Sequence, residues 1–321
     1  MRNNAVLPSV REAIGGTPLV ELSRITQGLD GKILAKLEYL NPGFSKKDRI
    51  ARQIIEDAER DGSLEPGQPV VELTSGNTGT GLAIVCGLTG HPFIAVMSKG
   101  NTQERARMMK ALGAQVVLVE QLPGSQPGKV SGGDLEQVER KTQEITRESN
   151  AFRADQFNHP GSFRAHYLHT GPEMLEQSNH SIQAFCDFAG TGGSFAGCAA
   201  AFKEANANIR CYLVEPAGCP VLAGKAVVNP NHVIQGGGYA MRQLSLVRPE
   251  HVDGYLQVTD EEAITAARRL AAKEYIFAGF SSGANVAAAL QLLRGPCRGQ
   301  VVAVIMNDSG LKYLSTDLYP E

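Results

Sequence analysis

The sequence has no marked excess of charge of either sign. Its 321 residues include 31 Lys and Arg against 33 Asp and Glu, which gives a formal net charge of −2. There is therefore no general electrostatic case for binding nucleic acid or an anionic membrane. Long apolar runs are missing as well, and none approaches the ~18–20 residues that cross a bilayer. We expect neither nucleic acid nor a membrane as a partner.

Paired cysteine motifs and a secretion signal are also missing. The amino-terminal stretch MRNNAVLPSVREAIGG lacks the apolar core of a signal peptide. In a chain of this size we therefore expect reduced, mostly buried thiols and a cytoplasmic location, rather than disulfides or zinc. His166 and His169 lie close in sequence, but neither an HExxH motif nor a cysteine cluster accompanies them, so no metal site is predicted. The six cysteines are Cys86, Cys186, Cys198, Cys211, Cys219 and Cys297.

Short apolar segments alternate with amphipathic ones from about residue 33 onward, and this alternation predicts an α/β fold. Buried strands separated by helices are typical of a parallel sheet covered on both faces. The length allows two such domains or one large α/β unit. A loop rich in Gly, Pro and Ser at 121–135 fits a linker and a mobile flap equally well. The predicted strands are KILAKLEYL (32–40), PVVELT (69–74), FIAVMS (93–98), QVVLVE (115–120), AFCDFA (184–189), RCYLVEP (210–216) and VVAVIM (301–306).

Two adjacent lysines lie where a helix is predicted to start. Ser45 and Asp48 have the form of an N-cap and its N3 partner. Lys46 and Lys47 then fall in the first turn, where the helix dipole disfavours a cation by a few tenths to ~1 kcal/mol. Either both are solvated and tolerated, or one of them is needed there. The predicted buried face of this helix consists of Ile50, Ile54, Ile55 and Ala58.

Glycine-rich turns follow several of the predicted strands. In VVELTSGNTGTGLAIV, the strand ends near Leu73 and a small polar turn from Thr74 to Gly79 leads into a helix. Backbone N–H groups at a helix start, together with hydroxyls and an amide, can bind a small anion. Simple capping is the alternative, because Ser, Thr and Asn are preferred at that position anyway.

The turn in AFCDFAGTGGSFAG is a stronger candidate for binding phosphate. Its glycines allow the backbone of 190–194 to approach an oxyanion closely, and the following helix dipole favours negative charge. A dinucleotide fingerprint is the competing interpretation. Gly190 and Gly192 fit that fingerprint, but Phe195 occupies the third glycine position. Glu215 could then bind a ribose, so a nicotinamide enzyme stays open at this point.

Two further segments contain clustered glycines or serines. In IFAGFSSGANVAAAL, the residues 279–283 precede an alanine-rich helix, and capping by serine is the default interpretation. In IQGGGYAM, the glycines 236–238 before Tyr239 suggest backbone packed against a ligand, although a flexible loop is nearly as plausible.

The order of these segments resembles the fold-type II pyridoxal-phosphate enzymes, specifically the cysteine synthase (O-acetylserine sulfhydrylase) and cystathionine β-synthase family. This resemblance covers nearly the full length. It implies a fold like that of the tryptophan synthase β subunit, with a smaller mobile domain at 39–152 and a larger domain formed by 1–38 and 153–321. It also implies a homodimer. The family-like segments are GGTPLVEL, KLEYLNPGFSKKDRIA, ELTSGNTGTGLA, QFNHP, HTGPE, GTGGSFAG, IFAGFSSGAN and NDSGLKYLST.

The resemblance also implies roles for individual residues. Lys47 matches the lysine before Asp-Arg that forms a Schiff base with pyridoxal 5'-phosphate, and the positive helix end would help to depress its amine pKa. Asn77 would bind the ring hydroxyl and Ser281 would face the pyridine nitrogen, where a neutral serine favours prompt β-elimination. The implied phosphate ligands are Gly190, Thr191, Gly192, Gly193 and Ser194. The implied substrate ligands are Thr74, Ser75, Asn77, Thr78, Gln156 and Gly236.

The implied activity is β-replacement, in which an O-activated L-serine, O-acetylserine above all, and sulfide give L-cysteine through an α-aminoacrylate. A cystathionine β-synthase-like enzyme or a β-elimination lyase is the alternative within the class. From other classes, an NAD(P)-binding oxidoreductase and a non-catalytic protein that kept the fold remain. Departures from the common pattern include Phe44, Lys46, where an apolar residue is usual, Thr80, and Tyr239, as in cystathionine β-synthases. They leave the nucleophile and the activating group open.

Overall fold

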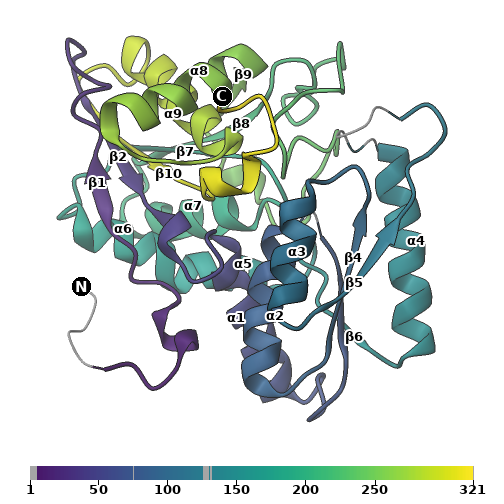
Figure 1. The fold of residues 1–321 in the computed structure, drawn as a ribbon. Helices are drawn as coiled ribbons and strands as arrows, with labels where there is room; N and C mark the ends of the chain where they lie inside the picture. Colours follow the sequence, from purple (N-terminus) through teal and green to yellow (C-terminus); the bar gives the residue numbers. More distant parts are fainter. Residues whose placement is uncertain (1–5, 75, 126–129, 131, 321) are drawn as a thin grey trace.

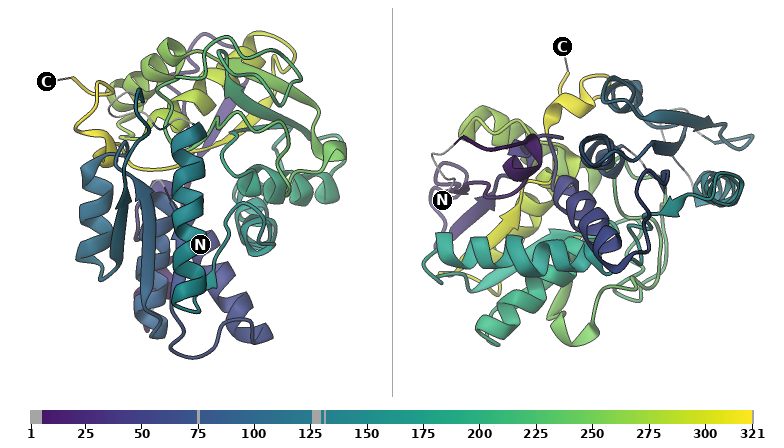
Figure 2. Two further views of the ribbon diagram at one scale, coloured as in Figure 1. Left: turned by 90° about the vertical axis from the view of Figure 1, so that its right-hand side faces the viewer. Right: turned by 90° about the horizontal axis from the view of Figure 1, so that it is seen from below.

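The computed structural model describes residues 6–74, 76–125, 130 and 132–320. Two sheets form the framework, and helices cover both faces of each (Figures 1 and 2). In the described part of the chain, all neighbouring strands are parallel except the pair β1–β2. This confirms the predicted α/β class with two parallel sheets.

The six-stranded sheet has the order β1 (Leu19–Glu21), β2 (Lys32–Lys36), β10 (Val301–Ile305), β7 (Ala184–Phe188), β8 (Arg210–Pro216) and β9 (Gly254–Val258). Helices α8 (Asp260–Arg269) and α9 (Phe280–Arg294) cover one face, and α6 (Gly171–Gln177) and α7 (Gly193–Ala205) cover the other (Figure 1). Successive side chains of β7 explain this arrangement. Cys186 packs in the core under α8 and α9, whereas Phe185 stacks on Phe195 of α7 and meets Phe202 of the same helix edge to face.

The four-stranded sheet has the order β5 (Gln115–Val119), β4 (Phe93–Ser98), β3 (Val70–Leu73) and β6 (Phe152–Arg153). One face carries α1 (Lys47–Asp61), α2 (Asn77–Thr89) and α3 (Gln103–Ala111), and the other carries α4 (Gly132–Glu148) (Figure 1). Val70 belongs to the core under α1 and α2, and Val71 to the core under α4. Strand β6 straddles the predicted domain boundary at 152, and the boundaries themselves stay a prediction.

Single-turn segments complete the chain. The short helix α5 (Gly161–Ala165) leads through a π-helical turn, His166–Thr170, into α6. The other such segments are the 3-10 turns Val10–Ala13, Glu38–Leu40, Pro249–His251 and Gly310–Tyr313 and the π-helical turn Leu270–Glu274. No helix in the described part of the chain is long and apolar enough to cross a membrane.

The predicted strand at 32–40 is too long. Strand β2 ends at Lys36, and Glu38–Leu40 form a 3-10 turn because the Glu38 carboxylate turns inward to Arg49 of α1. Glu173 binds the same guanidinium with both oxygens at 2.7 Å and also Lys36, at 2.6 Å. This buried network fixes the first turns of α1 against β2 and α6. It therefore positions the residues at the start of α1.

The predicted N-cap of α1 is displaced by one residue, although Ser45 Oγ does accept from the backbone N–H of Lys47 at 3.2 Å. The helix begins at Lys47, so Lys46 holds the N-cap position without a side-chain cap, and the Asp48 carboxylate instead accepts from the backbone N–H of Gly43. The predicted buried face of α1 is confirmed, because Ile50, Ile54, Ile55 and Ala58 are all buried.

The remaining sequence predictions have mixed outcomes. All six cysteines are free and buried, as predicted. The predicted loop at 121–135 extends too far, because α4 begins at Gly132, and its residues 126–129 and 131 lie outside the described part. His166 is buried and bonds the Thr170 hydroxyl through Nδ1. No group of three or more metal-ligating side chains occurs among the described residues.

Candidate active site

Lys47 lies where the carboxyl ends of the strands and the starts of several helices meet. It is the first residue of α1, and its Nζ lies 3.3 Å from Gln156 Oε1 and 3.3 Å from Thr191 Oγ1. Gln156 follows β6 and Thr191 follows β7, so the contact joins the two sheets. Three residues predicted from distant segments are thereby brought together.

The surroundings of Lys47 lower its pKa from 10.5 to about 7. Burial is the largest cause, the ammonium of Lys46 adds to it, and the carboxylates of Asp187 and Glu72 oppose it. The direction is the one expected from the sequence. The causes are burial and the neighbouring lysine, whereas the sequence suggested the helix dipole. A substantial fraction of this amine is therefore neutral and nucleophilic near pH 7.

The turn 190–194 connects β7 to α7 in a shape that only glycines allow. Gly192 has the left-handed φ of 87°. A Cβ on Gly193 would lie 2.8 Å from the carbonyl oxygen of Ser162, and one on Gly190 would lie 2.8 Å from that of Gly236. The first N–H groups of α7 have no partner within the helix. The turn thus presents main-chain donors at a positive helix end, which is the donor set that a phosphate needs.

The glycines 236–238 pack closely against the end of β7. Gly238 N–H donates to the carbonyl of Ala189 at 2.9 Å, and a Cβ on Gly237 would lie 2.5 Å from the same oxygen. Side chains in this segment would push it away from the turn that follows β7. Close backbone packing, rather than a plain flexible loop, therefore accounts for these glycines.

The polar turn before α2 is held by its own hydroxyls. Thr74 Oγ1 accepts from the N–H groups of Gly76 at 3.0 Å and Gly79 at 2.9 Å, so this side chain does cap the turn. Thr78 Oγ1 donates to Gln156 Oε1 at 2.5 Å. Gln156 Nε2 in turn donates to the carbonyl of Leu73 at 3.0 Å, which orients the amide oxygen toward Lys47. Ser75 lies outside the described residues.

Asn77 is oriented by two residues for which the sequence suggested no role. Its Nδ2 donates to Asp308 Oδ2 at 2.7 Å, and its Oδ1 accepts from Lys312 Nζ at 2.7 Å. Tyr313 also donates to Asp308 Oδ2 at 2.7 Å. Burial lowers the pKa of Lys312 to about 8, and the carboxylates of Asp308 and Asp48 counteract part of that effect. The segment NDSGLKYLST was part of the family pattern, but nothing in it pointed to Asn77.

A small cavity of about 30 Å³ brings most of the predicted cofactor residues to one place. The hydroxyl of Ser281, in the first turn of α9, faces it and bonds to no described residue. Asn307 Oδ1 and Gln235 Oε1 are buried without a hydrogen-bond partner among the described residues. The cavity is lined by Lys46, Lys47, Asn77, Phe188, Gly190, Thr191, Ser194, Gln235, Gly236, Ser281 and Asn307.

These observations fit pyridoxal phosphate. The cavity has an amine that is reactive toward aldehydes, a glycine turn that suits a phosphate, a neutral hydroxyl and unsatisfied polar atoms. Gly192 and Gly193 help to shape the turn, although they do not line the cavity.

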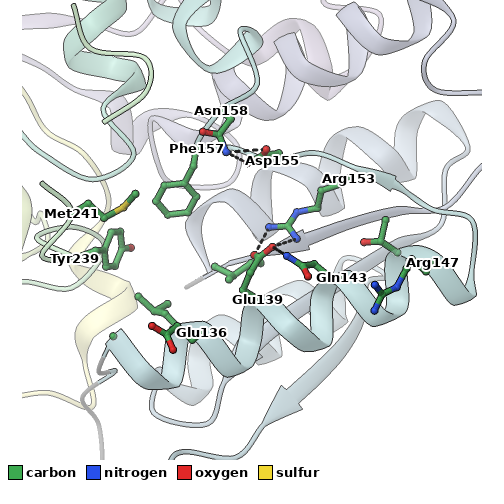
Figure 3. A pocket seen from close by; sticks show the side chains of 14 residues that line it. Glu136, Glu139, Gln143, Arg147, Arg153, Asp155, Phe157, Asn158, Tyr239 and Met241 are labelled. Atoms are coloured by element: carbon green, nitrogen blue, oxygen red, sulfur yellow. Dashed lines mark hydrogen bonds and ion pairs between the residues drawn. The ribbon is translucent and has the colours of Figure 1, made fainter. Parts of the chain in front are cut away.

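A cleft of about 500 Å³ shares Gln235 and Gly236 with this cavity and also has Thr74 and Gln156 in its walls. A second hollow of about 740 Å³ adjoins it along α4 (Figure 3). Phe157 and Tyr239 line both spaces, and their ring centroids are 5.9 Å apart. Figure 3 shows them beside Met241, across the hollow from the α4 side chains. Tyr239 is therefore placed to affect what enters the cleft.

The structure does not support a dinucleotide site, because the acidic residue that would bind the ribose is already hydrogen-bonded. Glu215 is buried, and its two carboxylate oxygens accept from the backbone N–H groups of Leu222 at 2.9 Å and Ala223 at 3.0 Å. This carboxylate holds a loop and is not free to bind a ribose.

Comparisons with known proteins agree with the geometry. A family model described as pyridoxal-phosphate dependent enzyme matches residues 10–308. Cysteine synthase of Staphylococcus aureus is 39% identical over 312 residues, which are 97% of this chain and 96% of that protein. The crystal structure of O-acetyl serine sulfhydrylase isoform 3 from Entamoeba histolytica superposes with a TM-score of 0.90 at 34% identity, covering 99% of this chain and 93% of that one.

A hydrogen sulfide-producing enzyme from Fusobacterium nucleatum superposes with a TM-score of 0.88 at 36% identity, covering 96% of this chain and 100% of that one. The cavity around Lys47, the glycine turn and these full-length similarities lead to one conclusion. The chain belongs to the family of pyridoxal-phosphate-dependent enzymes.

Proposed function

We propose that this protein is a β-replacement synthase that makes L-cysteine from an O-activated L-serine, O-acetylserine first, and sulfide. The observation that carries the proposal is the meeting of Lys47, Gln156 and Thr191 beside the glycine turn. The similarity to cysteine synthases over nearly the whole chain supports it.

Bound pyridoxal phosphate supplies an electron sink for the charge that develops at the substrate Cα. In this proposal Lys47, Asn77, Ser281 and the turn 190–194 hold that cofactor. Lys47 takes the proton from Cα and later returns it, a task that suits an amine with a pKa of about 7. Ser281 would face the ring nitrogen, and a neutral hydroxyl there would not hold that nitrogen protonated, which would favour loss of the β-substituent.

The substrate carboxylate would bind at the turn before α2 and at the Gln156 amide. Thr74, Asn77 and Thr78 belong to that turn, the family resemblance adds Ser75, and Thr74 and Gly236 both line the cleft. Closure of the smaller domain, which we predict for 39–152, would bring the turn onto the carboxylate and exclude water.

A larger thiol nucleophile, or β-elimination, is the second candidate. The cleft and the adjoining hollow are far larger than sulfide requires, and Tyr239 lines both of them. The hydrogen sulfide-producing relative adds weight to an elimination reaction. If the nucleophile is a larger thiol, Tyr239 would contact this second substrate and not the serine derivative.

Rapid-scanning absorbance tests both candidates. Serine, O-acetylserine and O-phosphoserine are mixed in turn with the enzyme loaded with cofactor, and sulfide or a larger thiol is added afterwards. We expect O-acetylserine to change the spectrum and sulfide to restore it with release of cysteine. Restoration by the larger thiol alone favours the second candidate. If no serine derivative changes the spectrum, the proposal is wrong.

We also infer a cytoplasmic homodimer. The six free, buried thiols fit a reducing compartment, and the dimer follows from the family resemblance. Light scattering of the purified full-length chain tests the assembly: a monomeric mass at micromolar concentration would rule out the dimer.

A further inference from the structure

Lys46 forms a buried ion pair directly behind the glycine turn. Its Nζ lies 2.9 Å and 3.1 Å from the two carboxylate oxygens of Asp187, which is fully buried on β7. Asn285 of α9 donates to the same carboxylate at 3.0 Å and to the carbonyl of Ile305 at 2.8 Å. The carboxylate is thus held by the Asn285 amide, and both it and the ammonium contact Ser194 at the end of the turn.

The hydroxyl of Ser194 is already engaged by this pair. It donates its only proton to Asp187 and accepts from Lys46 Nζ at 2.7 Å. It therefore cannot donate to an anion on the turn without giving up the Asp187 contact. An ammonium has three donors. One N–H of Lys46 can donate to both oxygens of Asp187, and a second N–H donates to Ser194. The third N–H is then available to donate into the cavity that Lys46 lines.

We propose that Lys46 is a charged ligand of the cofactor phosphate and supplies the donor that the Ser194 hydroxyl does not. This inference rests on the proposed assignment of 190–194 as the phosphate turn. Asp187 orients the ammonium and balances its charge while the phosphate is absent. A phosphate on the turn would accept hydrogen bonds from the main-chain N–H groups and from the ammonium.

The affinities of the cofactor-free full-length chain for pyridoxal phosphate and for pyridoxal measure this role. The two probes differ only in the phosphate, so their affinity ratio isolates the phosphate contribution. K46M/D187N removes both charges and leaves no unpaired buried ion. We expect its ratio to fall by roughly tenfold to a hundredfold, the usual effect of one hydrogen bond to a charged group. Affinity for pyridoxal should stay within about twofold of wild type, because that probe lacks the phosphate.

Two variants keep the cation and serve as controls. D187N and K46R should each keep a strong preference for pyridoxal phosphate. K46Q/D187N, which keeps a polar side chain at position 46, repeats the test should the methionine variant misfold. Circular dichroism verifies the fold of each variant.

The possible failures can be told apart. If K46M/D187N or K46Q/D187N keeps the wild-type ratio, Lys46 only neutralises Asp187 and the inference is overturned. If D187N lowers the affinity ratio as much as the double variant does, the carboxylate rather than the ammonium is required. This result would also overturn the inference. If the wild-type chain binds both probes equally, the assignment of the turn itself is wrong.

Discussion

The pH dependence of cofactor capture is the most quantitative consequence of the site. Only a neutral amine adds to the aldehyde of pyridoxal phosphate. The environment of Lys47 lowers its pKa to about 7, from an ordinary value of 10.5. At pH 8 such an amine is about 90% neutral, against about 0.3% for an ordinary lysine, an advantage of roughly 300-fold. Below pH 7 the neutral fraction falls about tenfold per pH unit, to about 1% at pH 5.

Stopped-flow absorbance of the cofactor-free chain with pyridoxal phosphate, from pH 5 to pH 9, follows the capture. Because the pKa is lowered, we expect the rate to rise through about pH 7 and to level off near pH 8. K46Q should shift this midpoint to higher pH, since the ammonium of Lys46 is one of the causes that lower the pKa of Lys47. K47A should form no covalent adduct. A rate that still rises steadily at pH 9 would refute the reasoning from burial.

Three further predictions concern the turn, the buried network and the cleft. G193A places a methyl group against a main-chain carbonyl, so it should weaken binding of pyridoxal phosphate, as measured by fluorescence titration. E38Q removes one partner of the buried pair with Arg49 and should lower the free energy of unfolding in urea by about 3–5 kcal/mol. Q156A should raise the KM for O-acetylserine about tenfold while changing kcat less, because the proposed contact is to the carboxylate in both ground and transition states.

Each of these variants has a matched control. G87A adds the same methyl group in α2, where it meets no other atom within 4 Å, and should not affect cofactor binding. E21Q alters an exposed ion pair with Lys32 and should change stability by less than about 1 kcal/mol. N158A removes a side chain of the outer hollow whose one hydrogen-bond partner among the described residues is Asp155, and its KM should stay near that of wild type. Equal effects in variant and control would contradict the corresponding prediction.

The buried strands could be predicted closely because their side chains are apolar on both faces. Strands β4 and β8 have the predicted bounds, 93–98 and 210–216. Strands β1, β6 and β9 gave no such signal, since they are short or partly exposed. The end of β2 could not be located either. KILAKLEYL stays apolar past Lys36, and what turns the chain is a carboxylate pairing with Arg49, in a later helix.

The roles in the candidate site came from family resemblance and not from local pattern. Local sequence patterns predicted that glycine turns follow the strands. They could not decide whether the turn binds the phosphate of pyridoxal phosphate or that of a dinucleotide. Contacts between residues far apart in the sequence could not be predicted. Lys46 is 141 residues from Asp187, and Asn77 is 231 residues from Asp308. The sequence around Lys46 does not indicate Asp187, and the sequence around Asn77 does not indicate Asp308. The contacts of Lys46 and Asn77 could therefore be found only from the fold.

Chemical mapping of the cofactor attachment tests the central claim most directly. The enzyme loaded with pyridoxal phosphate is reduced with borohydride, digested and sequenced by tandem mass spectrometry. We expect the pyridoxyl group on Lys47 alone, and none in K47A. Its attachment to the adjacent Lys46, or to any other lysine, would contradict the site described above.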